Sequence, residues 1–175
     1  VEVTPLIAEL PDGSWTGSWA VTMAAAASQC LGQGKTAILC VPDYRDQEQL
    51  MAALDAVLPA ERIVRLDARQ SNPDRYRATL ACLGDTALVI VGNRSVVYAP
   101  AARLGLIALW DDGDPLHSEP LSPYVHSRDA ASSGSSSRIA HCCSLPMPAV
   151  PKSKGSLNSG GSIMSPPFAV ICRRS

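Results

Sequence analysis

The stretch LGLIALWDDGDPLHSEP, residues 104–120, decides the fold class of this 175-residue chain. Residues 104–110 form a continuous apolar run, as expected for a strand that is buried on both faces. The run ends in three acids within four positions: Asp111, Asp112 and Asp114. Ligands of open parallel sheets gather at the carboxyl ends of the strands. The stretch therefore predicts an α/β protein with a group of carboxylates at one edge of its sheet.

Upstream, apolar runs alternate with helical patterns. The spacing predicts strands at 36–42, 61–67 and 86–92, and helices at 18–31, 45–58 and 72–84. In the second helix, Leu50, Leu54 and Val57 have the spacing of one apolar face. This alternation favours a mostly parallel sheet, in which the turns after strands 36–42, 86–92 and 104–110 open on the same edge.

Composition excludes few functions. Hydrophobic content is 46%, charged content is 18% and the net charge is −1, so no global basic field advertises nucleic-acid binding, although a local patch would suffice. No apolar run is long enough to span a bilayer, and we expect a cytoplasmic protein. The six cysteines lack metal-ligand spacing, so no metal site is predicted; Cys30, Cys40 and Cys82 lie in apolar stretches and are expected to be buried thiols.

The composition changes near residue 130. We expect residues 1–130 to form one domain and residues 131–175, a low-complexity segment rich in Ser, Pro and Gly, to be a disordered tail. Such a segment has too little apolar surface to offset the entropy of ordering it.

Two segments suggest a phosphate loop, which needs a glycine-rich turn between a strand and a helix. In LGQGKT, 31–36, the Gly-Lys pair follows a helix and precedes a strand, so a helix C-cap glycine is the better interpretation.

The second segment, PDGSWTGSWAV at 11–21, does precede a helix. If Thr16-Gly17-Ser18 is the remnant of a T-G-S-G-K-T loop, Trp19 replaces the glycine and Ala20-Val21 replaces Lys-Thr. Without the lysine, no ammonium bridges the β- and γ-phosphates. The alternative is an ordinary loop and helix start.

Several runs together resemble one family. GNRSVVYAP at 92–100, LGLIALWDDGD at 104–114 and PYVHSRD at 123–129 are similar to the G-T-R-S-A-x-F-x-P, L-G-x-I-x-x-D-E-E-H and R-Y-H-A-R-D runs of the replication-restart PriA family, also called primosomal protein N′. LGQGKTAILCVPD at 31–43 resembles the stretch in which a helix of that family ends in A-x-G-K and the next strand in V-P-E. The resemblance covers roughly residues 15–130 in unbroken order.

The resemblance implies a partial P-loop-helicase-like (RecA-like) domain. In active members the first acid of D-E-E-H helps to hold magnesium and the second activates water, and Asp111 and Asp112 fall on these positions. However, Asp112 is shorter than glutamate, so its carboxylate is displaced from the water that it would activate. Gly113 replaces the third acid and Asp114 replaces the histidine. The chain thus resembles a branch of the family whose helicase motifs have decayed.

The expected function is therefore that of a PriA-like fragment without helicase activity, and we expect no cofactor. The alternative is a live magnesium-dependent NTPase, or an ATP-dependent DNA helicase domain, that uses Asp111 and Asp112 with ATP and magnesium. A solvated acidic turn is a further interpretation of the same residues.

By the same resemblance, the partners would be DNA at branched forks and primosome or other replication proteins. Arg94, His126 and Arg128 are candidate DNA contacts or, equally, structural residues in ion pairs and hydrogen bonds. His117 follows the acids but is not at the family's histidine position.

The family's zinc-binding cysteine module, its amino-terminal DNA-binding domain and its later motor motifs have no counterpart here. We expect a partial copy whose tail is out of frame, which the nucleotide sequence would test. A small interaction domain that retains one partner-binding surface is a third interpretation. A partial motor should expose an apolar edge or face.

Overall fold

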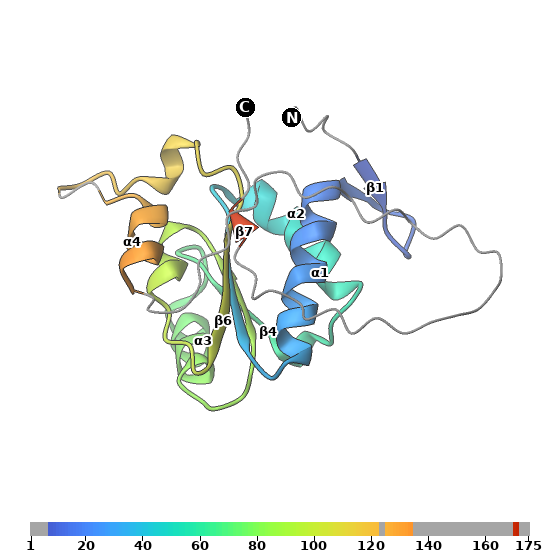
Figure 1. Cartoon of the computed structure of the whole chain (residues 1–175), viewed down its shortest axis with the longest axis horizontal. Helices are drawn as coiled ribbons and strands as arrows, with labels where there is room; N and C mark the ends of the chain where they lie inside the picture. The colour runs from blue at the N-terminus through green and yellow to red at the C-terminus, as the bar shows by residue number, and fades with distance from the viewer. Residues whose placement is uncertain (1–6, 123–124, 135–169, 172–175) are drawn as a thin grey trace, which may run out of the picture.

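The computed structural model describes residues 7–122, 125–134 and 170–171. Five parallel strands form its main sheet in the order β4-β5-β3-β6-β7 (Figure 1). They are β3 (Thr36–Cys40), β4 (Ile63–Leu66), β5 (Val89–Gly92), β6 (Leu104–Leu109) and β7 (Val170–Ile171). The α/β class and the parallel sheet expected from the sequence are confirmed.

Helices cover both faces of the sheet (Figure 1). On one side lie α1 (Ser18–Gly32) and α2 (Tyr44–Asp55), and on the other lie α3 (Asn72–Cys82) and α4 (Ser127–Gly134). Three short 3-10 helices complete the described part: η1 (Ala60–Arg62), η2 (Arg94–Tyr98) and η3 (Pro115–His117).

Local sequence explains where the helices begin. The Asp43 side chain accepts hydrogen bonds from the N–H groups of Arg45 and Asp46, which caps α2. Ser71 caps α3 in the same way, and Pro73 follows in the first turn, where a missing N–H costs nothing. The strands between the helices are rich in β-branched and large apolar residues, so their side chains pack on both faces of the sheet.

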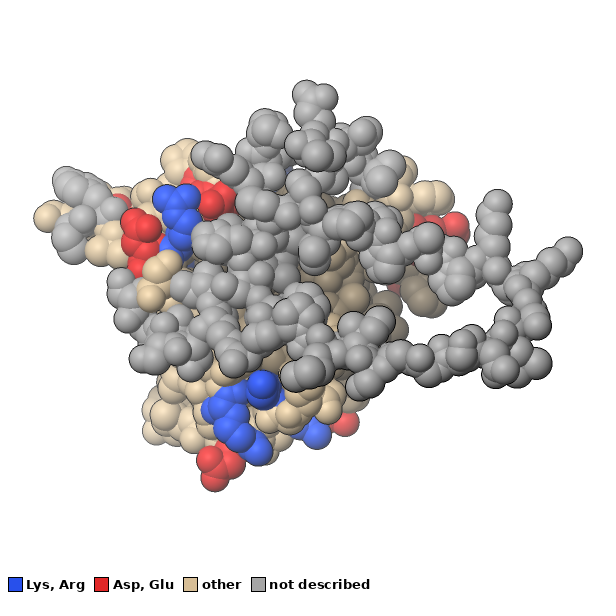
Figure 2. Space-filling model, viewed as in Figure 1, with Lys and Arg blue, Asp and Glu red and all other residues tan. Residues whose placement is uncertain are grey.

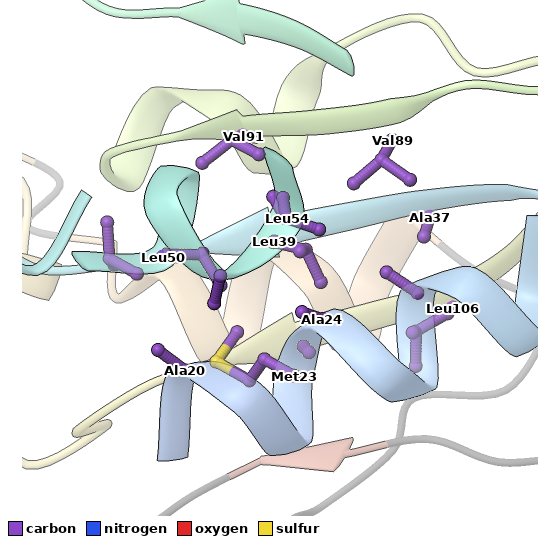
Figure 3. Packing of buried hydrophobic residues seen from close by; sticks show 14 of the residues in the cluster. Ala20, Met23, Ala24, Ala37, Leu39, Leu50, Leu54, Val89, Val91 and Leu106 are labelled. Atoms are coloured by element: carbon purple, nitrogen blue, oxygen red, sulfur yellow. The ribbon is translucent and has the colours of Figure 1, made fainter. Parts of the chain in front are cut away.

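The larger core lies between the sheet and helices α1 and α2 (Figure 3). Small residues of α1, such as Ala20 and Ala24, let the helix approach Leu39 of β3 closely, and Leu50 and Leu54 of α2 are fully buried beside them. A second core on the other face contains Ile38, Ile90, Ile107 and Leu109.

The strand before α1 does not join the main sheet. β1 (Ile7–Glu9) and β2 (Trp15–Gly17) instead form a separate antiparallel hairpin. The segment that the sequence identified as a degenerate phosphate loop therefore leaves a hairpin, whereas a phosphate loop leaves a strand of the central sheet.

The structure bears on two sequence-based expectations, at Val57 and at the boundary near residue 130. Val57 was expected on the apolar face of its helix, but it is exposed, because α2 ends at Asp55 and the chain turns away. α4 extends four residues past the expected boundary at 130, and Val170–Ile171 pair with β6; most of the expected tail, residues 135–169 and 172–175, lies outside the described residues. Within the described part, no helix is long and apolar enough to cross a membrane.

Candidate functional site

The expected carboxylates follow β6 at the carboxyl edge of the sheet. Asp111 has a φ of 50°, a left-handed conformation that aspartate tolerates better than most residues. Its carbonyl accepts a hydrogen bond from the N–H of Asp114, and the Asp114 side chain accepts one from the N–H of Leu116. Asp114 therefore caps η3, and the three aspartates do not form a metal-type cluster among the described residues.

Asp112 lies in an ion pair. Its Oδ2 is 3.1 Å from Nη1 of Arg128, and its side chain is only 7% exposed. The other oxygen, Oδ1, is buried and has no hydrogen-bond partner among the described residues. Two runs that the sequence singled out separately, DDGD and PYVHSRD, are thus joined at one contact.

His117 links the same two segments from inside. Its Nε2 lies 2.8 Å from the carbonyl oxygen of Trp110, so Nε2 carries the proton and donates it. Nδ1 is then the acceptor facing Sγ of Cys40 at 3.7 Å, and the His117 carbonyl accepts a hydrogen bond from Ser127. Every polar group of this fully buried residue therefore has a partner.

Burial shifts both titrating groups of this pair. It lowers the pKa of His117, with repulsion from His126 in the same direction; the Trp110 carbonyl and the charges of Asp114 and Asp111 oppose it. Burial likewise raises the pKa of the Cys40 thiol to about 12. His117 is consequently neutral and Cys40 protonated in the folded protein at neutral pH.

The remaining predicted contact residues also have structural partners. Arg94 forms an ion pair with Glu119 at 3.1 Å, with both side chains more than a third exposed. Nδ1 of His126 accepts a hydrogen bond from the N–H of Arg128, and a backbone bridge joins His126 to Ser118. These ion pairs and hydrogen bonds match the structural role that the sequence left open as an alternative. A DNA contact by Arg94, His126 or Arg128 stays a prediction.

A pair of tryptophans lies beside the acidic turn. The rings of Trp19 and Trp110 stack with centroids 4.3 Å apart and planes 10° from parallel. If residues 16–18 are the remnant of a phosphate loop, Trp19 takes the place of its glycine; Trp110 directly precedes Asp111. The stack joins the start of α1 to the end of β6, so the space between the loop remnant and the acidic turn holds two indole rings.

Residues 16–18, which were compared with a phosphate loop above, are hydrogen-bonded to α2. The N–H of Gly17 donates to the side-chain oxygen of Gln49 at 3.2 Å, and the hydroxyl of Thr16 donates to the main-chain oxygen of Gln49. The carbonyl of Ser18 accepts the hydroxyl of Thr22, one turn along α1. Three predicted cofactor-binding residues, Thr16, Gly17 and Ser18, thus hold the hairpin and helix in place.

The other glycine-rich segment, LGQGKT, ends α1 as predicted. Gly34 has a φ of 69°, and the N–H groups of Gln33, Gly34 and Lys35 bond to carbonyls of the last helical turn. A glycine suits this left-handed position, and the segment forms a helix C-terminus and no phosphate cradle.

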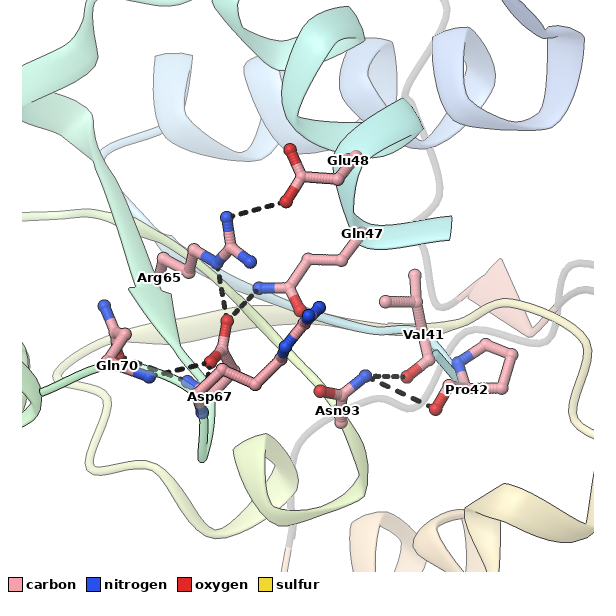
Figure 4. A network of polar contacts seen from close by, with 9 residues as sticks. Val41, Pro42, Gln47, Glu48, Arg65, Asp67, Gln70 and Asn93 are labelled. Atoms are coloured by element: carbon pink, nitrogen blue, oxygen red, sulfur yellow. Dashed lines mark hydrogen bonds and ion pairs between the residues drawn. The ribbon is translucent and has the colours of Figure 1, made fainter. Parts of the chain in front are cut away.

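At the other end of the carboxyl edge lies a polar network that the sequence analysis did not identify (Figure 4). Asp67 follows β4, and its side chain is 1% exposed. It accepts hydrogen bonds from Arg65 at 2.6 Å and from the fully buried Gln47 at 3.2 Å, and also from the N–H groups of Arg69 and Gln70.

These bonds shape the electrostatics of Asp67. Burial acts to raise its pKa, but the hydrogen bond and charge of Arg65, together with the N–H of Arg69 and the amide of Gln47, lower it below the ordinary value. Asn93, after β5, donates to the carbonyls of Val41 and Pro42, after β3. The turns after β3, β4 and β5 are thus fixed by side chains.

Arginine and tyrosine lie at the outer side of this network. The guanidinium of Arg69 is 4.2 Å from the ring centre of Tyr44, and Arg45 donates to the Tyr44 hydroxyl. The ion pairs between described residues involve neither Arg45 nor Arg69. Beyond Asp67 is an open pocket of about 290 Å³, whose lining includes Arg75, Ser95 and Tyr98.

In the view of Figure 2, the Lys and Arg side chains that are not covered lie in small groups near Asp and Glu. Among the described residues, no three His, Cys, Asp or Glu side chains are placed to hold a metal ion. Cys30, Cys40 and Cys82 are buried free thiols, as predicted, while the other three cysteines lie outside the described residues.

Comparison with known proteins finds relatives over part of the chain. No protein-family model matches the chain. Over 113 residues, the chain is 40% identical to the probable replication restart protein PriA of Mycobacterium tuberculosis and 37% identical to that of Mycobacterium leprae. It is 31% identical over 107 residues to the replication restart protein PriA of Chlamydia pneumoniae. The mycobacterial matches cover 65% of this chain and 17% of the relatives' own length.

Proposed function

Over its matched 113 residues this chain belongs to the replication restart protein PriA family, and we propose that it serves replication restart by contacting DNA without hydrolysing ATP. The chain spans about a sixth of the length of the relatives. The proposed function is therefore that of a segment and not that of a whole relative.

The observation that carries the proposal is the Trp19–Trp110 stack beside the acidic turn. A nucleotide site needs backbone N–H groups, a lysine and open space for phosphates. Here the N–H of Gly17 bonds to Gln49, Ala20 occupies the position of the lysine, and two indole rings fill the space. Asp112, at the position of the water-activating acid, is paired with Arg128. The residues present do not fit a magnesium nucleotide.

For DNA we favour the other end of the edge. Arg45 and Arg69 flank the exposed ring of Tyr44, and guanidinium groups together with an aromatic face suit phosphates and unstacked bases. Branched forks and primosome proteins remain the expected targets through the family, and a cytoplasmic location is part of this proposal.

A fluorescent ATP analogue with magnesium tests the first half. We expect no saturable binding by the folded chain. Saturable binding that is lost in Asp111→Asn would overturn the proposal in favour of the NTPase. Oδ1 of Asp112, which has no hydrogen-bond partner in the described part of the chain, would then be available to that site.

Fluorescence anisotropy with a labelled DNA fork tests the second half. Arg69→Ala and Tyr44→Ala should each weaken binding several-fold, since stacking contributes about 1–3 kcal/mol per base. Arg62→Ala is the matched control, because Arg62 directly precedes β4, at the opposite edge of the sheet, and its guanidinium donates to the carbonyl of Ala87. Equal losses in all three variants would contradict this assignment of the DNA contact.

A further inference from the structure

The apolar surface that a partial motor was expected to expose includes one side of α3. Tyr76, Leu80 and Leu83 are 66%, 48% and 64% exposed, and we call them the α3 stripe. Their spacing of four and then three residues puts all three on one face of the helix. Leu83 follows the last helical residue but keeps helical dihedrals, φ −77° and ψ −13°, so the stripe runs to the end of the helix.

The stripe points away from the sheet. Cys82 is the only buried residue of α3, and Arg75 and Thr79 line the pocket toward η2. A surface helix normally hides its apolar side against the core and shows its polar side to water. In α3 three large apolar side chains instead face solvent, as they do where a helix packs against a second molecule.

We propose that the α3 stripe is the interface of a weak homodimer, in which α3 packs antiparallel against α3 of a second copy. A twofold axis beside Leu80 places Leu80 against its own equivalent. The same axis brings Tyr76 opposite Leu83 of the second copy, within one residue of register. The stripe is thus complementary to itself, which a twofold interface requires.

Charge favours the antiparallel arrangement. In the first half of α3, Asp74 and Arg77 pair with each other at 2.7 Å, so Arg75 leaves one net positive charge there, whereas Asp85 lies just beyond the end of the helix. An antiparallel pair puts the positive half of each helix beside Asp85 of the other copy, and it opposes the two helix dipoles. A parallel pair would place like charges side by side.

The size of the stripe sets the strength of the contact. One helix face is smaller than the roughly 800 Å² per partner of a stable interface, so we expect a Kd on the order of tens to hundreds of micromolar. This contact is independent of the proposed DNA and nucleotide properties.

Sedimentation velocity of the full chain across that concentration range tests the proposal. We expect a monomer–dimer equilibrium that Leu80→Arg weakens roughly tenfold or more, because Leu80 lies at the centre of the interface and the new charges would face each other. Leu116→Arg is the matched control, since Leu116 has the same 48% exposure on η3. A chain that stays monomeric, or a dimer that Leu80→Arg leaves intact, overturns the proposal.

Cross-linking tests the register. Leu80→Cys should form a disulfide-linked dimer under mild oxidation, because the axis brings the two positions 80 together, while Leu116→Cys should give no more dimer than the unmodified chain. Equal cross-linking of the two variants would overturn the antiparallel register, and circular dichroism verifies that both are folded.

Discussion

The two ends of the carboxyl edge use the same kinds of residue in opposite ways. Beside β6, the acidic turn is closed by an indole stack and by the pair of Asp112 with Arg128. Beside β4, a carboxylate is buried as well, but Asp67 has four hydrogen-bond donors, and outside it lie Arg45 and Arg69, which form no ion pair with another described residue. On one sheet, the carboxylate at one end is therefore enclosed by side chains, whereas the other end presents a polar surface.

The largest effect is expected at the open end. Asp67→Ala would leave Gln47 and Arg65 without their shared acceptor, and should lower the free energy of unfolding by about 3 kcal/mol. Urea denaturation measures it. Arg77→Ala, which removes only the exposed pair with Asp74, should cost less than about 0.5 kcal/mol. Similar losses in the two variants would mean that the Asp67 network adds nothing beyond surface charge.

At the closed end, Trp19→Ala should lower the free energy of unfolding by about 2 kcal/mol, because the half-buried indole loses its stacking partner and leaves a gap. Trp15→Ala, on an exposed side chain of the hairpin, is the control and should change little. The variant should still not bind the ATP analogue, since the lysine remains absent. A gain of nucleotide binding would show that the indole alone had closed the site.

The ion pairs sharpen the comparison further. Arg128→Ala leaves the buried carboxylate of Asp112 without its partner and should cost about 1–2 kcal/mol. Arg94→Ala breaks an exposed pair with Glu119 and should cost less than about 0.5 kcal/mol. Urea midpoints of the two variants measured side by side decide the point. A larger loss for Arg94→Ala would reverse the roles assigned here.

The sequence predicted the elements better than it predicted contacts. Each strand and helix expected between residues 18 and 110 exists, because the periodicity of apolar residues reports burial directly. The prediction that Val57 lies on the apolar face of the helix was wrong, because the spacing of apolar residues does not show where the helix ends.

The site was predicted less well. Local pattern identified the acidic turn, the loop remnant and the PYVHSRD run as separate features. Only the fold brings Asp112 to Arg128 and Trp19 to Trp110, across 16 and 91 positions. The Asp67 network was missed altogether, because its members come from two segments, α2 and residues 65–70, that carry no motif. A carboxylate at the end of a predicted strand, as in ERIVRLD, was the one available signal.

The smallest effect belongs to His117, which couples the closed end to pH. Its pKa is lowered in the folded state, so the unfolded chain binds the proton more tightly and stability falls as the pH drops below about 6.5, the ordinary histidine value. Between pH 6.5 and 5.5 the loss should be at most about 1 kcal/mol. His117→Gln keeps an amide that can donate to the Trp110 carbonyl but does not titrate, so its urea midpoint should lose this part of the pH dependence. If both proteins weaken equally over that range, the titrating group lies elsewhere, and the closed end is held by stacking and the Asp112–Arg128 pair alone.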